Sequence, residues 1–225
     1  MIENLTSLLG LSFGLGLLHA LDADHILAVS ALSSENTGRQ NARRYALRWS
    51  LGHGVMLLAI ILLLHFSGSI MSAQVSQLAE RVVGGVLIIL GLLVLFQIRK
   101  KSLHIHFHQH KNTLHAHWHQ HAADDKEKQN HQHEHKAVLI GSIHGLAGSA
   151  PLIALIPLSA ANSLSISLLY LFVFSLGVFV AMLSFGGLFG SALKRLSDIS
   201  EKYASMAKSV VAVLAIVAGV HLVSA

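Results

Sequence analysis

The chain has 225 residues, of which 53% are hydrophobic and 12% are charged. A soluble domain has about a quarter of its residues charged, so this composition excludes an ordinary soluble protein and indicates a membrane protein. The absence of cysteine excludes disulfides and thiolate metal sites, which leaves imidazole and oxygen as the strong metal ligands.

Six long apolar blocks follow one another along the chain, each able to cross a hydrocarbon core that needs about 20 residues of helix. The first block follows a start that carries Glu3 and no Lys or Arg up to Thr6, so we expect no cleaved leader. The sequence predicts an all-α membrane protein with six transmembrane helices, at 5–32, 47–66, 82–98, 138–160, 164–193 and 208–224.

The Lys and Arg residues are distributed one-sidedly between these blocks. The segments after the first, third and fifth blocks hold 15 of the 16 basic residues, and only Arg81 lies on the opposite side. Such segments stay cytoplasmic during insertion. We therefore expect a bacterial-type inner (plasma) membrane protein with both termini outside, and we assign the net charge of +5 to topology and not to nucleic-acid binding.

An offset of 125 residues aligns the two halves of the chain. It brings His19 onto His144 and the run Ser50-Leu51-Gly52 onto Ser175-Leu176-Gly177, and Gly91 meets Gly219 after three more residues. A unit of three spans inserts the other way up when it is duplicated. The sequence thus predicts two inverted three-helix repeats, at 1–98 and 137–225, joined by a cytoplasmic segment at 99–136.

Two transmembrane helices are predicted to be interrupted. Pro151 and Pro157 in the fourth block each remove a backbone donor, which disfavours a straight helix. If the halves are related, the first helix breaks at the matching point, near 22–25.

A group of ionisable residues lies inside the first block. Such groups cost about 3 kcal/mol each in a span and normally face a bundle interior or a water-filled path. On a regular helix His19, Asp22 and His25 share one stripe, whereas Asp24 points away from it. Either the helix unwinds here so that Asp24 turns inward, which we favour, or Asp24 fixes the tautomer of an imidazole.

Imidazoles with carboxylates and no sulfur suit nickel, cobalt, zinc or copper as divalent ions better than sodium, magnesium or calcium. His53 between two glycines and His144 with Ser149 from the other half are further candidate ligands, although an interhelical hydrogen bond would also explain either histidine. His65 and His221 lie near helix ends, where a polar side chain costs little, and are not assigned a role.

The run from His19 to Ile26, with a His followed after four residues by Asp24-His25, resembles the signature of the nickel/cobalt transporter family. The run Ser50-Leu51-Gly52-His53 is similar to its second-helix motif, and 144–149 resembles a stretch in its shorter, urease-accessory-type members. The resemblance implies nickel or cobalt transport, with His19, Asp24 and His25 essential, Asp22 supporting them and His53 contributing.

The segment between the third and fourth blocks holds 11 of the 17 histidines, between residues 104 and 135, and many of them alternate with other residues. We expect this segment to be disordered and to bind metal, as a trap, donor or sensor in the cytoplasm. A cytoplasmic metallochaperone docking here is a candidate partner besides the ion and the bilayer, whereas no nucleic acid and no cofactor are expected.

Three alternatives were weighed against uptake. Efflux would need antiport, whereas an inside-negative potential favours inward movement of a doubly charged cation by roughly 4.6 kcal/mol per 100 mV. An intramembrane serine protease with Ser149 and His221 as its dyad leaves Asp22, Asp24 and His25 without a role. A metal sensor would not need charged residues inside the first helix. We therefore predict a metal-uptake permease working by alternating access, and no enzyme.

Overall fold

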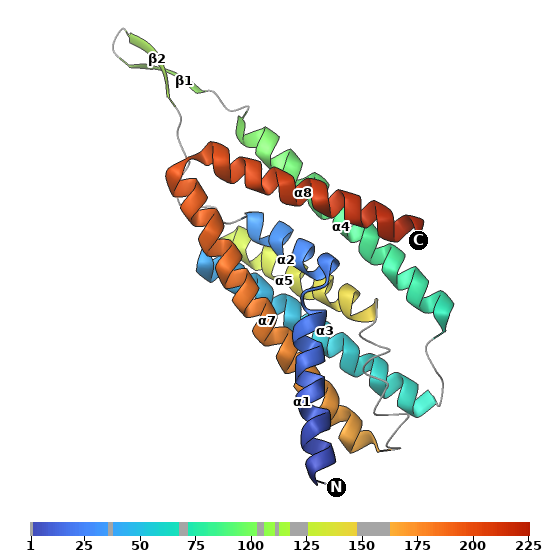
Figure 1. The fold of residues 1–225 in the computed structure, drawn as a ribbon. Coiled ribbons are helices and arrows are strands. Elements are labelled where there is room, and N and C mark those ends of the chain that lie inside the picture. Colours follow the sequence, from blue (N-terminus) through green and yellow to red (C-terminus); the bar gives the residue numbers. More distant parts are fainter. Residues whose placement is uncertain are drawn as a thin grey trace.

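The computed structural model describes residues 2–35, 38–67, 72–102, 106–110, 113–117, 126–147 and 163–225. The helices are α1 (Ile2–His19), α2 (Ala23–Glu35), α3 (Arg39–Ser67), α4 (Ala73–Ser102), α5 (Lys126–Leu146), α7 (Leu164–Ile199) and α8 (Glu201–Ser224). Two short strands, β1 (His106–His110) and β2 (Thr113–His117), form an antiparallel hairpin at one end of the molecule (Figure 1).

Four helices, α3, α4, α7 and α8, are each long and apolar enough to cross a membrane. The α1–α2 pair is a further candidate for a single span, bent by 58° at its break. Only the first part of the predicted fourth span is described, as the end of α5, and Pro151 and Pro157 lie outside the described residues. A count of six spans therefore stays a prediction.

The predicted interruption of the first helix is confirmed. Helix α1 ends at His19, where the amides of Leu21 and Asp22 bond to the carbonyl oxygens three residues before them and so tighten the last turn. The Asp22 carbonyl oxygen then accepts the amide of Ile26 and begins α2. Asp24 lies in the first turn of α2, where a negative charge suits the helix dipole. The break contains neither proline nor glycine.

The helices extend beyond the apolar blocks into segments predicted as connections. Helix α7 runs to Ile199, and Ser200 alone separates it from α8, with the Ser200 side chain accepting the amide of Lys202 as a cap. The structure also differs from the prediction for 99–136, which was disorder, and from a strictly all-α fold. Two alternating His-x-His runs pair as strands, because alternation places like residues on one face of a strand.

Close helix crossings hold the bundle together at glycines. A Cβ on Gly16 of α1 would collide with the carbonyl oxygen of Phe174 in α7, and one on Gly141 of α5 would collide with that of Trp49 in α3. Helices α4 and α8 meet in the same way, with Gly84 against Gly219. Each of these three crossings joins the first half of the sequence to the second (Figure 1).

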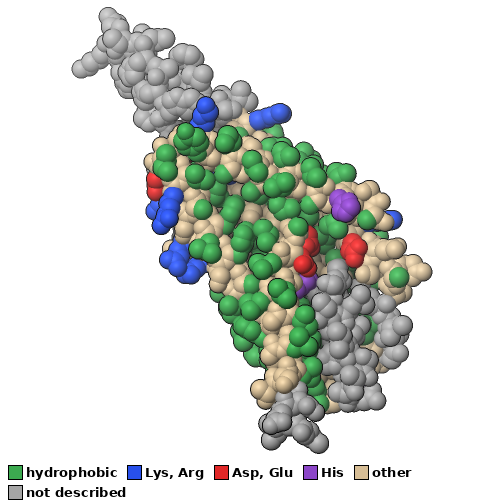
Figure 2. Space-filling view, viewed as in Figure 1, with side chains coloured by type: hydrophobic (Ala, Val, Ile, Leu, Met, Phe, Trp, Pro, Cys, Tyr) green, Lys and Arg blue, Asp and Glu red, His purple; other side chains and the backbone are tan. Residues whose placement is uncertain are grey.

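Large apolar side chains cover much of the outer surface. Figure 2 shows hydrophobic side chains spread over one face, with Lys and Arg gathered toward one end of it. Exposed leucine and valine residues occur on all four of the long apolar helices. Apolar surface on this scale is unusual for a soluble monomer and is expected where helices face lipid.

Candidate metal site

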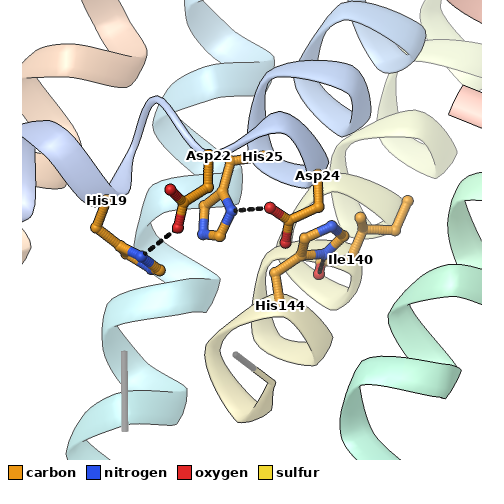
Figure 3. A network of polar contacts seen from close by, with 6 residues as sticks. All are labelled: His19, Asp22, Asp24, His25, Ile140 and His144. Atoms are coloured by element: carbon orange, nitrogen blue, oxygen red, sulfur yellow. Dashed lines mark hydrogen bonds and ion pairs between the residues drawn. The ribbon is translucent and has the colours of Figure 1, made fainter. Parts of the chain in front are cut away.

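The break between α1 and α2 brings the ionisable groups of the first helix together. His19 is the last residue of α1, and Asp22, Asp24 and His25 follow within the break and the first turn of α2 (Figure 3). His19 and His25 are 5% and 2% exposed, and their ring centroids lie 4.4 Å apart. A straight helix would have directed Asp24 away from the others, so the break is what assembles the group.

Helix α3 supplies a third imidazole to this group. His53 is fully buried, and its ring centroid lies 5.5 Å from that of His19 and 5.4 Å from that of His25. One nitrogen from each of the three rings lies within 4.8 Å of the other two. Ligand atoms bound to one ion at about 2 Å lie within about 4 Å of one another, so small side-chain adjustments would bring these nitrogens close enough to share an ion.

Helix α5, in the second half of the sequence, supplies a fourth imidazole. The ring of His144 lies 5.6 Å from that of His25, and its Nδ1–H donates to the carbonyl oxygen of Ile140 at 2.8 Å. A neutral imidazole that donates from Nδ1 keeps Nε2 free of a proton, which is the tautomer that binds a metal. The Ile140 carbonyl thus fixes both the direction and the tautomer of His144.

Most of the buried ring nitrogens have no hydrogen-bond partner among the described residues. They are both nitrogens of His19 and His53 and the Nε2 atoms of His25 and His144. An unpaired buried polar group costs about 1–3 kcal/mol, and native structures have few of them. Six in one place are therefore a strong sign of a site that binds something able to pair with imidazole nitrogen.

Two carboxylates lie against the imidazoles. Asp24 Oδ1 accepts from His25 Nδ1 at 3.0 Å, and His25 Nε2 has no hydrogen-bond partner among the described residues (Figure 3). Asp22 Oδ2 lies 2.9 Å from His19 Nδ1, an ion-pair contact without hydrogen-bond geometry. The side chain of Asp22 is 50% exposed and that of Asp24 is 25% exposed. Asp22, Asp24 and His25 also form a second group whose ligand atoms lie within 4.8 Å of one another.

All six residues singled out in the sequence thus lie in one connected group. Asp24 orients an imidazole, which is the second of the two roles considered for it, while the unwinding that we favoured also occurs. The remaining histidines are placed elsewhere: His65 is half-buried near the end of α3 and His221 is exposed in the last turn of α8. Ser149, the partner of His221 in the protease alternative, lies outside the described residues.

The sequence analysis missed Trp49. Its ring is fully buried in α3, stacks on His53 with a centroid distance of 5.1 Å, and meets His25 at 4.9 Å and His144 at 5.5 Å. Phe174 of α7 borders the cluster at His19, with a centroid distance of 5.6 Å. Trp49 lies one helical turn before His53, and this spacing was the available signal.

Comparisons with known proteins give two matches. The family model described as the cytochrome c biogenesis protein transmembrane region matches residues 26–221. The urease accessory protein UreH of Bacillus sp. (strain TB-90) is 28% identical over 187 residues, which are 83% of this chain and 78% of the relative. No solved structure matches the chain. With the apolar helices, these similarities make the chain a multi-pass membrane protein.

Proposed function

The chain belongs to the family described as the cytochrome c biogenesis protein transmembrane region, and we propose that it carries a divalent transition-metal ion, nickel(II) or cobalt(II), across the membrane. The ion passes through the imidazole cluster formed by His19, His25, His53 and His144. The observation that carries this proposal is a group of four buried imidazoles inside a bundle of apolar helices, six of whose ring nitrogens have no hydrogen-bond partner among the described residues.

The chemistry of the donors supports a borderline metal ion. Neutral imidazole binds nickel, cobalt, copper and zinc, whereas hard cations prefer all-oxygen sites. The chain has no cysteine to offer a softer ligand. The choice of nickel or cobalt rests on the resemblance of 19–26 and 50–53 to the nickel/cobalt transporter family. The similarity to a urease accessory protein agrees with that family's urease-accessory-type members.

The carboxylates give the ion a graded path into the cluster. A hydrated divalent cation first meets the half-exposed Asp22, whose charge offsets part of the cost of removing water. It then loses its remaining water to the buried imidazoles, where Asp24 orients His25 and supplies a compensating negative charge. This sequence of steps separates dehydration from tight binding.

The internal repeat supports alternating access. The crossing of Gly16 with α7 and the crossing of Gly141 with α3 are related by the offset of 125 residues, since Phe174 and Trp49 also differ by 125. Both crossings join opposite halves, so the halves interlock and do not form two separate bodies. We therefore propose that alternating access moves pairs of helices and not sequence halves. One such movement would shift α4 together with α8 relative to α1, α2, α3 and α5, which carry the imidazoles.

We propose uptake as the direction, because the inside-negative potential drives a doubly charged cation inward without a coupled ion. The test is the nickel and cobalt content of cells that express the intact chain or its His25→Ala variant. We expect the intact chain to raise cell metal severalfold and His25→Ala to abolish the increase. His221→Ala, which changes an exposed histidine outside the cluster, is the control and keeps the increase.

Each other outcome has a defined meaning. A His25-dependent fall in cell metal would retain the site and reverse the direction to efflux. No change in either metal, with the protein present in the membrane, would overturn metal transport.

A further inference from the structure

Trp49 makes more ring contacts with the imidazole cluster than any other residue outside it, among the described part of the chain. It touches three of the four imidazoles, at centroid distances between 4.9 and 5.5 Å. These three come from α2, from its own helix α3 and from α5, so the indole lies where the two halves of the chain meet. A rigid ring in this place limits how far each imidazole can turn.

Helix packing alone does not require an indole at this position. In the internal repeat, Trp49 corresponds to Phe174. The two residues lie at equivalent helix crossings: the carbonyl oxygen of each contacts a glycine on a helix from the other half of the chain. Phe174 is also fully buried, yet it meets one imidazole where Trp49 meets three. A phenyl ring is thus sufficient for the crossing, and the larger ring at Trp49 has another use.

The indole N–H gives a second, independent observation. Trp49 Nε1 is buried and has no hydrogen-bond partner among the described residues. Phenylalanine would fill most of the same space without this cost, which is about 1–3 kcal/mol for an unpaired buried donor. Tryptophan and tyrosine usually find a partner for their polar atom when buried. The unpaired N–H beside the unpaired imidazole nitrogens indicates a residue that serves the site.

We propose that Trp49 is a positioning residue of the metal site. Its ring holds His25 and His53 in the orientation in which their nitrogens approach one another, and it keeps His144 beside them. Its N–H is available to a water or anion that completes the coordination. This inference rests on the proposed function, and it adds a residue that sets how well the ligands fit the ion.

The test is cobalt binding to the purified full chain, followed by the visible absorption of the bound ion, which depends on ligand geometry. The histidine-rich segment is expected to bind cobalt as well, so the spectrum of His25→Ala, which retains that segment, is subtracted. We expect Trp49→Phe to fold as the intact chain does, to weaken cobalt binding by about tenfold and to shift the absorption band, because groups that orient ligands contribute about 10–100-fold to affinity.

Tyr45→Phe is the matched control, because it removes one polar group from a buried aromatic residue one turn earlier in the same helix. It leaves the band and the affinity unchanged. An unchanged cobalt absorption band in Trp49→Phe would overturn the proposal. The proposal would also be overturned if Trp49→Phe lost enough thermal stability to account for its weaker cobalt binding. A missing cobalt band in the unsubstituted chain would instead count against the proposed function.

A second measurement leaves Trp49 in place. The chain has two tryptophans, so Trp118→Phe makes Trp49 the single one. Nickel(II) quenches fluorescence at short range. We expect it to quench the fluorescence of Trp49 in the Trp118→Phe variant, and we expect no quenching when His53→Ala is combined with Trp118→Phe. Absence of quenching in a chain that shows the cobalt band would contradict the placement of Trp49 at the ion.

Discussion

His53 is fully buried, and neither of its ring nitrogens has a hydrogen-bond partner among the described residues. A histidine retained only for an interhelical hydrogen bond would use at least one nitrogen, and no such bond to His53 is found in the described part of the chain. We expect His53→Ala to abolish metal accumulation, because it removes a ligand from the centre of the cluster. Cell metal content measures the effect.

The matched control for this prediction lies on the same helix. His65 is twelve residues further along α3, half-buried near the end of the helix, with its ring 5.4 Å from that of Phe66. His65→Ala should leave accumulation within about twofold of the intact chain. Equal losses in both variants would show that α3 tolerates no change, and would remove the argument for His53 as a ligand.

The candidate ligands could be selected from the sequence because charge and imidazole are costly inside a span, which makes His19, Asp22, Asp24, His25, His53 and His144 conspicuous. The geometry of these residues could not be predicted from the sequence. The role of Asp24 depends on a break of three residues, and Trp49 lies between Arg48 and Ser50 at the start of a predicted span, with no sign in its neighbours of a role at the site. Only the packing of α3 against α2 and α5 brings its indole onto three imidazoles.

At the scale of the elements, glycines set how closely the helices approach. Gly16→Ala would place a methyl group against the Phe174 carbonyl oxygen in α7, so either the crossing opens or the backbone shifts. Overpacking of this kind typically costs about 1–3 kcal/mol. We expect a lower unfolding temperature and, because α1 carries His19, weaker cobalt binding. Thermal unfolding of the purified protein and the cobalt spectrum measure the two effects.

Gly14 is the control within the same helix, since a Cβ there meets no atom within 4 Å. Alanine favours a helix over glycine by about 1 kcal/mol. Gly14→Ala should therefore leave stability unchanged or raise it slightly, the opposite sign to Gly16→Ala. Loss of stability in both variants would trace the effect to α1 itself and not to the crossing.

The positions of the helices follow from hydrophobic run length, whereas their ends do not. The predicted spans at 47–66 and 82–98 correspond to α3 and α4, but each helix is longer, by up to nine residues at one end. Hydropathy indicates which residues lie within the hydrocarbon core. A helix can extend beyond the hydrocarbon core as long as its backbone hydrogen bonds are satisfied. The hairpin of β1 and β2 was missed because the alternating histidines were interpreted as an extended chain with too little apolar content to fold by itself.

At the scale of the whole molecule, the interlocked halves restrict how the site can open. A rocking of one sequence half against the other would separate α1 from α7, α3 from α5 and α4 from α8, which meet at glycines. The imidazoles come from α1, α2, α3 and α5, so a movement that keeps the crossings intact must open the site along the α2 side, where Asp22 is half-exposed.

The number of crossings determines which side of the membrane each end of the chain occupies. Ser72, between α3 and α4, and the last residue, Ala225, lie on the same side if 138–160 crosses fully, because four crossings then separate them. They lie on opposite sides if that segment turns back, because three remain. The chain has no cysteine, so Ser72→Cys and Ala225→Cys are each unique labelling sites.

We expect both cysteines to react with a membrane-impermeant maleimide in intact cells, and Ala123→Cys in the histidine-rich segment to react only after permeabilisation, as the distribution of basic residues predicts. Reaction of Ala123→Cys alone would invert the orientation and would put the histidine-rich segment on the side from which the ion is taken up. Labelling of only one of Ser72→Cys and Ala225→Cys would reduce the spans to five. The pairing of α5 with α3 would then be a contact with a re-entrant segment, and His144 would reach the ion from the tip of that segment.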